Sequence, residues 1–264
     1  MSVESACFVI DFSAVARRGW GRAARIPLRA IPPRLRVPIL QGPARGLWWR
    51  VGAGDHGCWL GSYELEAQLA CCRILNAGDA ACDVGANAGF FSLLMNRLVG
   101  PLGAIVAFEP VASNVAELRD TLARNHVVNV NIVSAAVAAS TGMSLFARGH
   151  SRFAGRLHDR GDQIVPTIAL DDAYGEDARA PRLIKIDVEG AAADVVRGAR
   201  RLLTRRQSTL LFELHNVYEL TAVKRELDAV DYQLADLRGA PIGTEIDWPR
   251  FLRALGTPRR SAGG

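Results

Sequence analysis

The chain has 264 residues and a net charge of +5, with 49% hydrophobic and 22% charged residues, which is ordinary for a globular protein with a buried core. It contains no apolar run near the ~18 residues of a transmembrane helix, and its N-terminus lacks the pattern of a secretory signal. Its five cysteines form no Cys-x-x-Cys pair, so we expect free thiols and a cytoplasmic location.

The positive charge is concentrated near the N-terminus, where residues 1–55 hold nine arginines against three acidic residues. No aromatic residue alternates with these arginines as a base-stacking platform requires, so we expect no sequence-specific nucleic-acid binding. We interpret residues 1–37 as a basic, partly ordered arm, with weak contact to an anionic membrane as its alternative role. Residues 38–256 are expected to form one folded domain, and residues 257–264 a flexible tail.

Apolar periodicity predicts a β-hairpin from residues 47–51 and 58–60, followed by a helix over residues 63–75. Polar, glycine-rich residues 148–163 are expected to form a functional or disordered loop. The remaining strands alternate with helices, which predicts an α/β fold with a parallel sheet covered on both faces. The predicted strands are 80–84, 104–108, 130–137, 143–147, 164–170, 183–187, 208–214 and 232–237, and the predicted helices 88–99, 112–125, 190–203 and 217–229.

The most informative segment is the loop that follows the strand at residues 80–84. The strand ends in Asp83, and a loop with Gly85, Asn87 and Gly89 leads into an apolar helix. Glycine has no Cβ, so a ligand can lie against the backbone, and the helix start offers unpaired N–H groups. The next strand ends in Glu109, where a carboxylate can accept from both hydroxyls of a ribose. The pattern predicts a nucleoside-containing cofactor.

The same loop favours S-adenosylmethionine over a dinucleotide. Dinucleotide folds use Gly-x-Gly-x-x-Gly, but Asn87 stands at the middle glycine position here. The carboxylate of Asp83 would repel a pyrophosphate and could bind an ammonium group. S-adenosylmethionine has an amino group, a ribose diol and no phosphate. An NAD-dependent oxidoreductase and a non-catalytic nucleoside-cofactor-binding protein are the alternatives.

A second polar cluster follows two later strands. Alternation places Lys185, Asp187 and Glu189 on one side of their strand, where burial is costly unless they pair or bind a ligand. An ion pair of Lys185 with either carboxylate is the structural alternative. Glu213 and His215 share a face of the next strand, and His215 could accept a proton from a hydroxyl because imidazole titrates near neutral pH.

Two other readings of this cluster stay open. Carboxylates with a histidine could hold a divalent cation, although the spacing is not diagnostic and we expect no metal. Three further histidines are rival bases, namely His126, which is expected to end its helix, and His150 and His158 in the polar loop.

The chain resembles the FkbM-type family of S-adenosylmethionine-dependent methyltransferases over about residues 40–235. The resemblance implies a Rossmann-like class I fold, usually with seven strands of which the last is antiparallel, and mostly O-methylation of varied acceptors such as sugars and polyketide hydroxyls. It rests on the segments Trp59-Leu-Gly-Ser-Tyr-Glu64, Asp83-Val-Gly-Ala-Asn-Ala-Gly89, Ala107-Phe-Glu-Pro110, Thr167-Ile-Ala-Leu-Asp171, Ile184-Lys-Ile-Asp-Val-Glu-Gly190 and Leu211-Phe-Glu-Leu-His215.

The resemblance implies a role for most of the polar residues above. We therefore expect O-methylation of a hydroxyl on a small molecule, sugar or glycan, with His215 as base and Asp187 or Glu189 orienting the acceptor. One departure is Ala192, where the family commonly has an acidic residue. The implied cofactor ligands are Asp83, Gly85, Asn87 and Gly89 around the methionine part, Glu109 at the ribose, Glu64 closing the pocket and Ala136 near the adenine.

Overall fold

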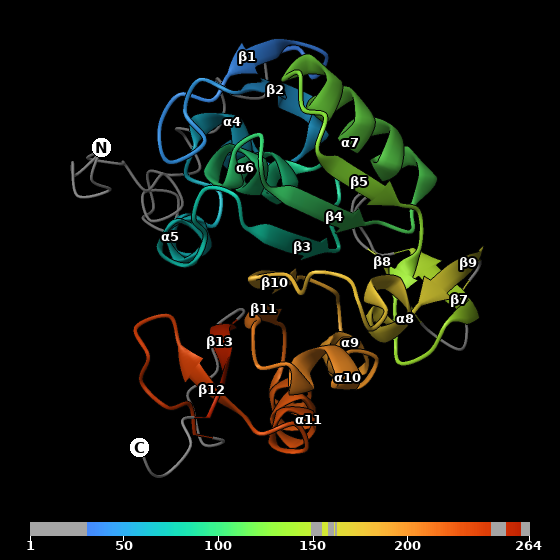
Figure 1. Ribbon diagram of the computed structural model, residues 1–264. Helices are drawn as coiled ribbons and strands as arrows, with labels where there is room; N and C mark the ends of the chain where they lie inside the picture. The colour runs from blue at the N-terminus through green and yellow to red at the C-terminus, as the bar shows by residue number, and fades with distance from the viewer. Residues whose placement is uncertain (1–30, 149–154, 158–160, 162, 244–251, 260–264) are drawn as a thin grey trace.

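The computed structural model describes residues 31–148, 155–157, 161, 163–243 and 252–259. Its centre is a seven-stranded sheet in the order β12-β13-β11-β10-β3-β4-β5 (Figure 1). β13 is antiparallel to both of its neighbours and the other pairings are parallel, so the predicted mostly parallel seven-stranded sheet is confirmed. The strands are β3 (Ala80–Val84), β4 (Ala104–Phe108), β5 (Val130–Val133), β10 (Leu183–Ile186), β11 (Thr209–Leu214), β12 (Tyr232–Asp236) and β13 (Leu252–Pro258).

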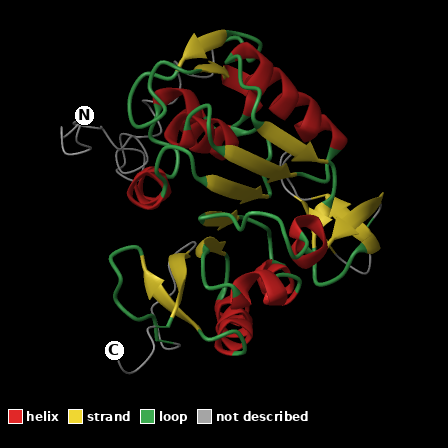
Figure 2. Cartoon of the chain, in the orientation of Figure 1, coloured by secondary structure: helices red, strands yellow, loops and turns green. Residues whose placement is uncertain are grey.

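Helices cover both faces of this sheet, as the red helices on either side of the yellow strands in Figure 2 show. Side chains alternate along each strand, so each face has its own apolar cluster. One face packs against α5 (Leu65–Ile74), α6 (Phe90–Val99) and α7 (Ala112–Arg124). The other packs against α8 (Leu170–Tyr174), α9 (Ala192–Arg197), α10 (Arg200–Thr204) and α11 (Val217–Asp228).

The polar side chains of the central strands point to the face covered by α5, α6 and α7. Asp83 and Lys185 are partners in the register of β3 and β10, and Glu213 and Arg253 are partners in that of β11 and β13. The intervening residues, such as Cys82 and Ile184, belong to the apolar cluster of the opposite face. One face of a largely apolar sheet therefore carries a buried polar group near the carboxyl ends of its parallel strands.

The predicted hairpin of residues 47–51 and 58–60 is wrong. β2 (Trp48–Arg50) pairs with β1 (Arg36–Pro38), which lies before it in the chain. Residues 58–60 instead lie in α4 (His56–Leu60), after a 3-10 turn at Val51–Ala53. The side chain of Asp55 accepts a hydrogen bond from Gly57 N–H and caps α4, which explains why this short apolar segment is helical.

Two predicted elements are each divided in the structure. The strand expected at 130–137 becomes β5 and β6 (Ala136–Val137), and the helix expected at 190–203 becomes α9 and α10. β6 joins a small second sheet in the order β6-β9-β7-β8, with β7 (Gly142–Arg148), β8 (Gly155–Leu157) and β9 (Gln163–Ile168). The expected loop at 148–163 thus contains β8 and the ends of β7 and β9. Its remaining residues, including His150 and His158, lie outside the described residues.

Ordered strands extend slightly beyond the expected domain of residues 38–256. β1 begins at Arg36 and β13 ends at Pro258. Two arginines of the basic N-terminal region are held by acidic residues of α7, since Arg36 pairs with Asp120 and Arg50 with Glu117. Residues 1–30 lie outside the described residues. Among the helices that the structure describes, none is both long and apolar enough to cross a membrane.

Candidate active site

The loop after β3 is held close to the strand β10. Gly85 has a φ of +81°, and a Cβ at this position would lie 2.1 Å from the carbonyl oxygen of Asp187. Glycine is therefore required here both for its backbone conformation and for the lack of a side chain. Gly89, with a φ of +91°, precedes α6, and a Cβ there would collide with Leu118. The loop thus brings its own backbone against two neighbouring elements.

Asp83 presents a buried carboxylate at the end of β3. It is 1% exposed, and its Oδ2 accepts a hydrogen bond of 2.6 Å from the hydroxyl of Ser92. Its Oδ1 has no hydrogen-bond partner among the described residues. Burial raises the pKa of Asp83, whereas Lys185 and Ser92 oppose that shift. A buried carboxylate with one unused oxygen fits a cationic group such as an ammonium.

Glu109 lies on the neighbouring strand and holds the glycine loop in place. Its Oε2 accepts from Asn87 N–H at 2.9 Å, and its Oε1 accepts from Val111 N–H at 2.9 Å and the amide of Asn114 at 3.2 Å. Burial raises the pKa of Glu109, and these hydrogen bonds oppose the shift. Carboxylate oxygens together have about four acceptor sites, so Glu109 keeps some acceptor capacity. Its role at a ribose stays a prediction.

A cavity of about 150 Å³ lies beside the loop. Of the residues predicted to form the site, Asp83, Gly85, Asn87 and Asp187 line it. The segment before the loop supplies aromatic side chains, including Trp49, which was expected in a hairpin, and Tyr63, which was expected to begin a helix; sequence reasoning gave neither a role at the site. Their signal in the sequence was weak, because scattered aromatic residues are usual in an apolar core.

Lys185 is a buried cation that joins this cavity to the second cluster. Its Nζ lies 2.8 Å from Asp187 Oδ2 and 4.3 Å from the ring centre of Phe91. Burial alone would lower the pKa of Lys185, but the carboxylates around it, Asp187 first, raise it above its ordinary value. The ion pair weighed as the structural alternative is therefore present, and it fixes one oxygen of Asp187.

Glu64 and Glu213 form a buried carboxyl pair with Arg253, which sequence reasoning missed. The Nη2 of Arg253 lies 2.9 Å from Glu213 Oε2, and its Nε lies 3.8 Å from Glu64 Oε2. Burial and the charge of Asp187 raise the pKa of Glu213, whereas Arg253 opposes the shift. Burial raises the pKa of Glu64 to about 7. Glu64 has a φ of +44°, a rare conformation for a residue with a side chain.

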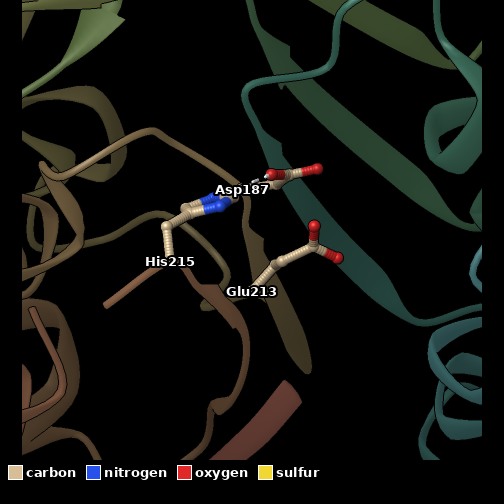
Figure 3. A group of neighbouring side chains, drawn as sticks. All are labelled: Asp187, Glu213 and His215. Atoms are coloured by element: carbon tan, nitrogen blue, oxygen red, sulfur yellow. Dashed lines mark ion pairs between the residues drawn. The ribbon is translucent and has the colours of Figure 1, made fainter. Parts of the chain in front are cut away.

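Asp187, Glu213 and His215 come together from the ends of β10 and β11 (Figure 3). One ligand atom from each lies within 4.8 Å of the other two, so the group could hold a metal ion. The two carboxylates already pair with Lys185 and Arg253, which supply positive charge without a metal. The Nε2 of His215 lies 3.9 Å from Asp187 Oδ1 and has no hydrogen-bond partner among the described residues.

Other predicted residues are farther from this cluster. Glu189 is exposed in the turn after β10 and belongs to no ion pair of the described residues. Ala136 begins β6 and packs in a small cluster with Val111, which links it to the loop held by Glu109. His126 follows α7 with a φ of +56°, as expected for a residue that ends a helix.

Residues 83–236, more than half of the chain, match the family model of the methyltransferase FkbM domain. The chain belongs to the FkbM methyltransferase family. Membership confirms the predicted enzyme class and S-adenosylmethionine as the cofactor, and it sets aside the oxidoreductase alternative. A search of curated proteins finds no match.

One solved FkbM methyltransferase shares the fold, and other methyltransferase structures are also similar to the chain. The FkbM methyltransferase from Methylobacillus flagellatus KT is 19% identical with a TM-score of 0.50, and the match covers 68% of this chain and 43% of that one. The precorrin-6y C5,15-methyltransferase from Geobacter metallireducens GS-15 is 17% identical, with a TM-score of 0.47 and coverage of 75% and 88%. The ribosomal protein L11 methylase from Lactobacillus delbrueckii subsp. bulgaricus is 12% identical, with a TM-score of 0.49 and coverage of 78% and 81%.

The residues of this FkbM protein fit the cofactor. Asp83, whose Oδ1 has no hydrogen-bond partner among the described residues, lines the cavity together with Gly85, and such a carboxylate oxygen can accept a hydrogen bond from the amino group of a small ligand. The carboxyl ends of β3 and β10 border the same cavity through Asp83 and Asp187. Ligands of open α/β sheets bind at this edge.

Proposed function

We propose that this FkbM methyltransferase methylates a hydroxyl group on a small molecule, sugar or glycan. The observation that carries the proposal is the position of His215. Its Nε2 has no hydrogen-bond partner among the described residues, and it lies 3.9 Å from a carboxylate that lines the cofactor cavity. A histidine nitrogen in this position can take the proton of an acceptor hydroxyl.

Asp187 supports this role in two ways. Its Oδ2 is held by Lys185, which leaves Oδ1 directed toward His215. A carboxylate at 3.9 Å stabilises the imidazolium that forms when Nε2 takes a proton. Oδ1 can also accept a hydrogen bond from a second hydroxyl of the acceptor, which would orient a polyol such as a sugar.

Proton transfer and alignment are the main tasks of the protein in such a reaction. Bound S-adenosylmethionine supplies a methyl group on a positively charged sulfur that leaves as a neutral thioether. The chain has to hold the acceptor oxygen in line and keep water away. The Nε2 of His215 is buried, so bulk water has little access to this atom.

We place the reaction in the cytoplasm. Cys58, Cys71, Cys72 and Cys82 are free thiols in the structure, which agrees with a reducing compartment. The proposal of a hydroxyl acceptor is supported by the chemistry of His215 and Asp187.

The experiment has a binding step and a transfer step. Calorimetry should detect S-adenosylmethionine binding to the wild type and a weaker interaction with the Asp83→Ala variant. In the transfer step, methyl-labelled cofactor and a panel of sugars, polyols and phenols are supplied to the wild type and to His126→Ala. This control variant replaces a histidine outside the site. Absence of cofactor binding by the folded wild type would refute the proposal, as would transfer to amines and thiols but never to hydroxyls.

A further inference from the structure

Trp49 carries a polar atom whose partner is missing from the fold. Its side chain is 2% exposed, and its ring meets Phe90 edge to face at a centroid distance of 5.7 Å. Its indole Nε1–H has no hydrogen-bond acceptor among the described residues. An indole nitrogen can only donate, and buried tryptophans usually find an acceptor for it. The missing acceptor is therefore expected to come from a ligand.

Two nearby tryptophans show that this is particular to Trp49. Trp59 donates its indole N–H to the Nδ1 of His56 at 3.0 Å. Trp48 is 49% exposed, so water can satisfy its ring nitrogen. Among the tryptophans that the structure describes, Trp49 alone is both buried and without an acceptor.

The indole edge of Trp49 lies at the cofactor cavity. Trp49 lines this cavity together with Asp83 and Gly54. Its Cζ2, which is on the same edge of the ring as Nε1, lies 3.5 Å from the place of a Cβ on Gly54. Position 54, which also lines the cavity, is thus next to the ring edge that carries the N–H group.

The residues that line the cavity therefore include one with an unused buried acceptor, Asp83 Oδ1, and one with an unused buried donor, Trp49 Nε1–H. An α-amino acid complements this pair, since its ammonium donates and its carboxylate accepts. Lys185, the cationic side chain among the described residues that line the cavity, is already paired with Asp187. A neutral donor such as indole can hold a carboxylate in a site that acidic residues otherwise make unfavourable for it.

We propose that Trp49 Nε1–H donates a hydrogen bond to the carboxylate of the amino-acid part of S-adenosylmethionine. The inference rests on the cofactor assignment. It adds a cofactor-binding residue outside residues 83–236, the part of the chain that matches the family model. Trp49 then makes the cavity selective for ligands that keep this carboxylate.

The test compares two ligands that differ only in that group. Calorimetry measures S-adenosylmethionine and its decarboxylated analogue, which keeps the sulfonium and the amine, against the wild type, Trp49→Phe and the control Trp48→Phe. Trp49→Phe should weaken S-adenosylmethionine binding about tenfold, as expected for a hydrogen bond to a charged group, and leave the analogue unchanged. Trp48→Phe should alter neither affinity.

A second measurement follows the wild type, and the variant serves only to assign the signal. In ¹⁵N-labelled protein, the indole N–H signal that disappears in Trp49→Phe should move downfield with S-adenosylmethionine and stay in place with the analogue. Equal weakening of both ligands by Trp49→Phe, or no weakening of either, would overturn the role of Trp49 alone. Failure of the wild type to bind S-adenosylmethionine would overturn the cofactor assignment together with it.

Discussion

Lys185 Nζ lies 2.8 Å from Asp187 Oδ2, and this buried pair connects the cofactor cavity to the predicted acceptor site. The Lys185 side chain is 4% exposed, so its charge depends on the surrounding carboxylates. Lys185→Met should lower the free energy of unfolding by ~3–5 kcal/mol, because the variant leaves buried carboxylates without their cation. Urea denaturation measures the change. Arg179→Met, at the exposed pair with Asp79, is the control and should cost under ~1 kcal/mol. Equal costs for the two variants would contradict the role given to burial.

Glu64 should make stability fall as the pH rises toward neutral. Its folded pKa of about 7 lies above the ordinary value of 4.5, so the folded chain binds the extra proton between these values. The contribution of Glu64 to the free energy of unfolding is fully present below about pH 4.5 and is lost as the pH rises toward 7. Across this pH window the free energy of unfolding of the wild type should fall by on the order of 2 kcal/mol because of Glu64. Glu64→Gln, which mimics the protonated acid, should not show this fall. Urea denaturation at several pH values checks this, with exposed Glu66→Gln as the control. If the free energies of unfolding of the wild type and Glu64→Gln changed with pH in parallel, Glu64 would not be the source of the pH dependence.

Gly85→Ala should destabilise the chain and abolish cofactor binding. Both Gly85 and Gly78 have a positive φ, but a Cβ at Gly78 meets no atom within 4 Å. Gly78→Ala therefore measures backbone strain alone, about 1–2 kcal/mol. Gly85→Ala adds a collision with Asp187 O, which should cost about 1–3 kcal/mol more. Thermal unfolding and calorimetry compare the two variants. A Gly85→Ala protein that binds the cofactor normally would show that the loop need not lie so close to β10.

His215→Ala should slow methyl transfer by roughly a hundredfold or more and leave the affinity for S-adenosylmethionine unchanged. The separation follows because His215 is not among the residues that line the cofactor cavity. Single-turnover kinetics with a hydroxyl acceptor measures the transfer step, and calorimetry measures binding. His126→Ala should affect neither quantity. A loss of cofactor binding with an unchanged transfer rate would place His215 in the cofactor site instead.

Removal of metal ions should leave the activity unchanged. Lys185 and Arg253 already balance the carboxylates of Asp187 and Glu213, so the cluster has no need of a cation. Dialysis against EDTA followed by an assay of labelled methyl transfer is the measurement. A loss of activity that Mg²⁺ or Mn²⁺ restores in the wild type, but not in Glu213→Gln, would assign the three side chains of Figure 3 to a metal.

The sequence predicted the strand, glycine loop and helix around Asp83 well because their signals are local. Asp83, Gly85 and Asn87 lie within five residues of one another, and strand-to-helix punctuation places them without knowledge of distant contacts. The hairpin at residues 47–60 was predicted wrongly for a related reason. Three apolar residues fit a strand as well as a helix, and the partner strand and the Asp55 cap decided between them.

By itself the sequence determined the α/β class, the glycine loop between Asp83 and the following helix, and the two strand ends that carry Asp187 and His215. These depend on periodicity and on contiguous residues. Only the tertiary structure decided that Arg253 joins Glu64 and Glu213 and that Trp49 lines the cavity beside the glycine loop. Contacts between residues so far apart in the chain depend on the register and packing of whole elements, and no local pattern encodes them.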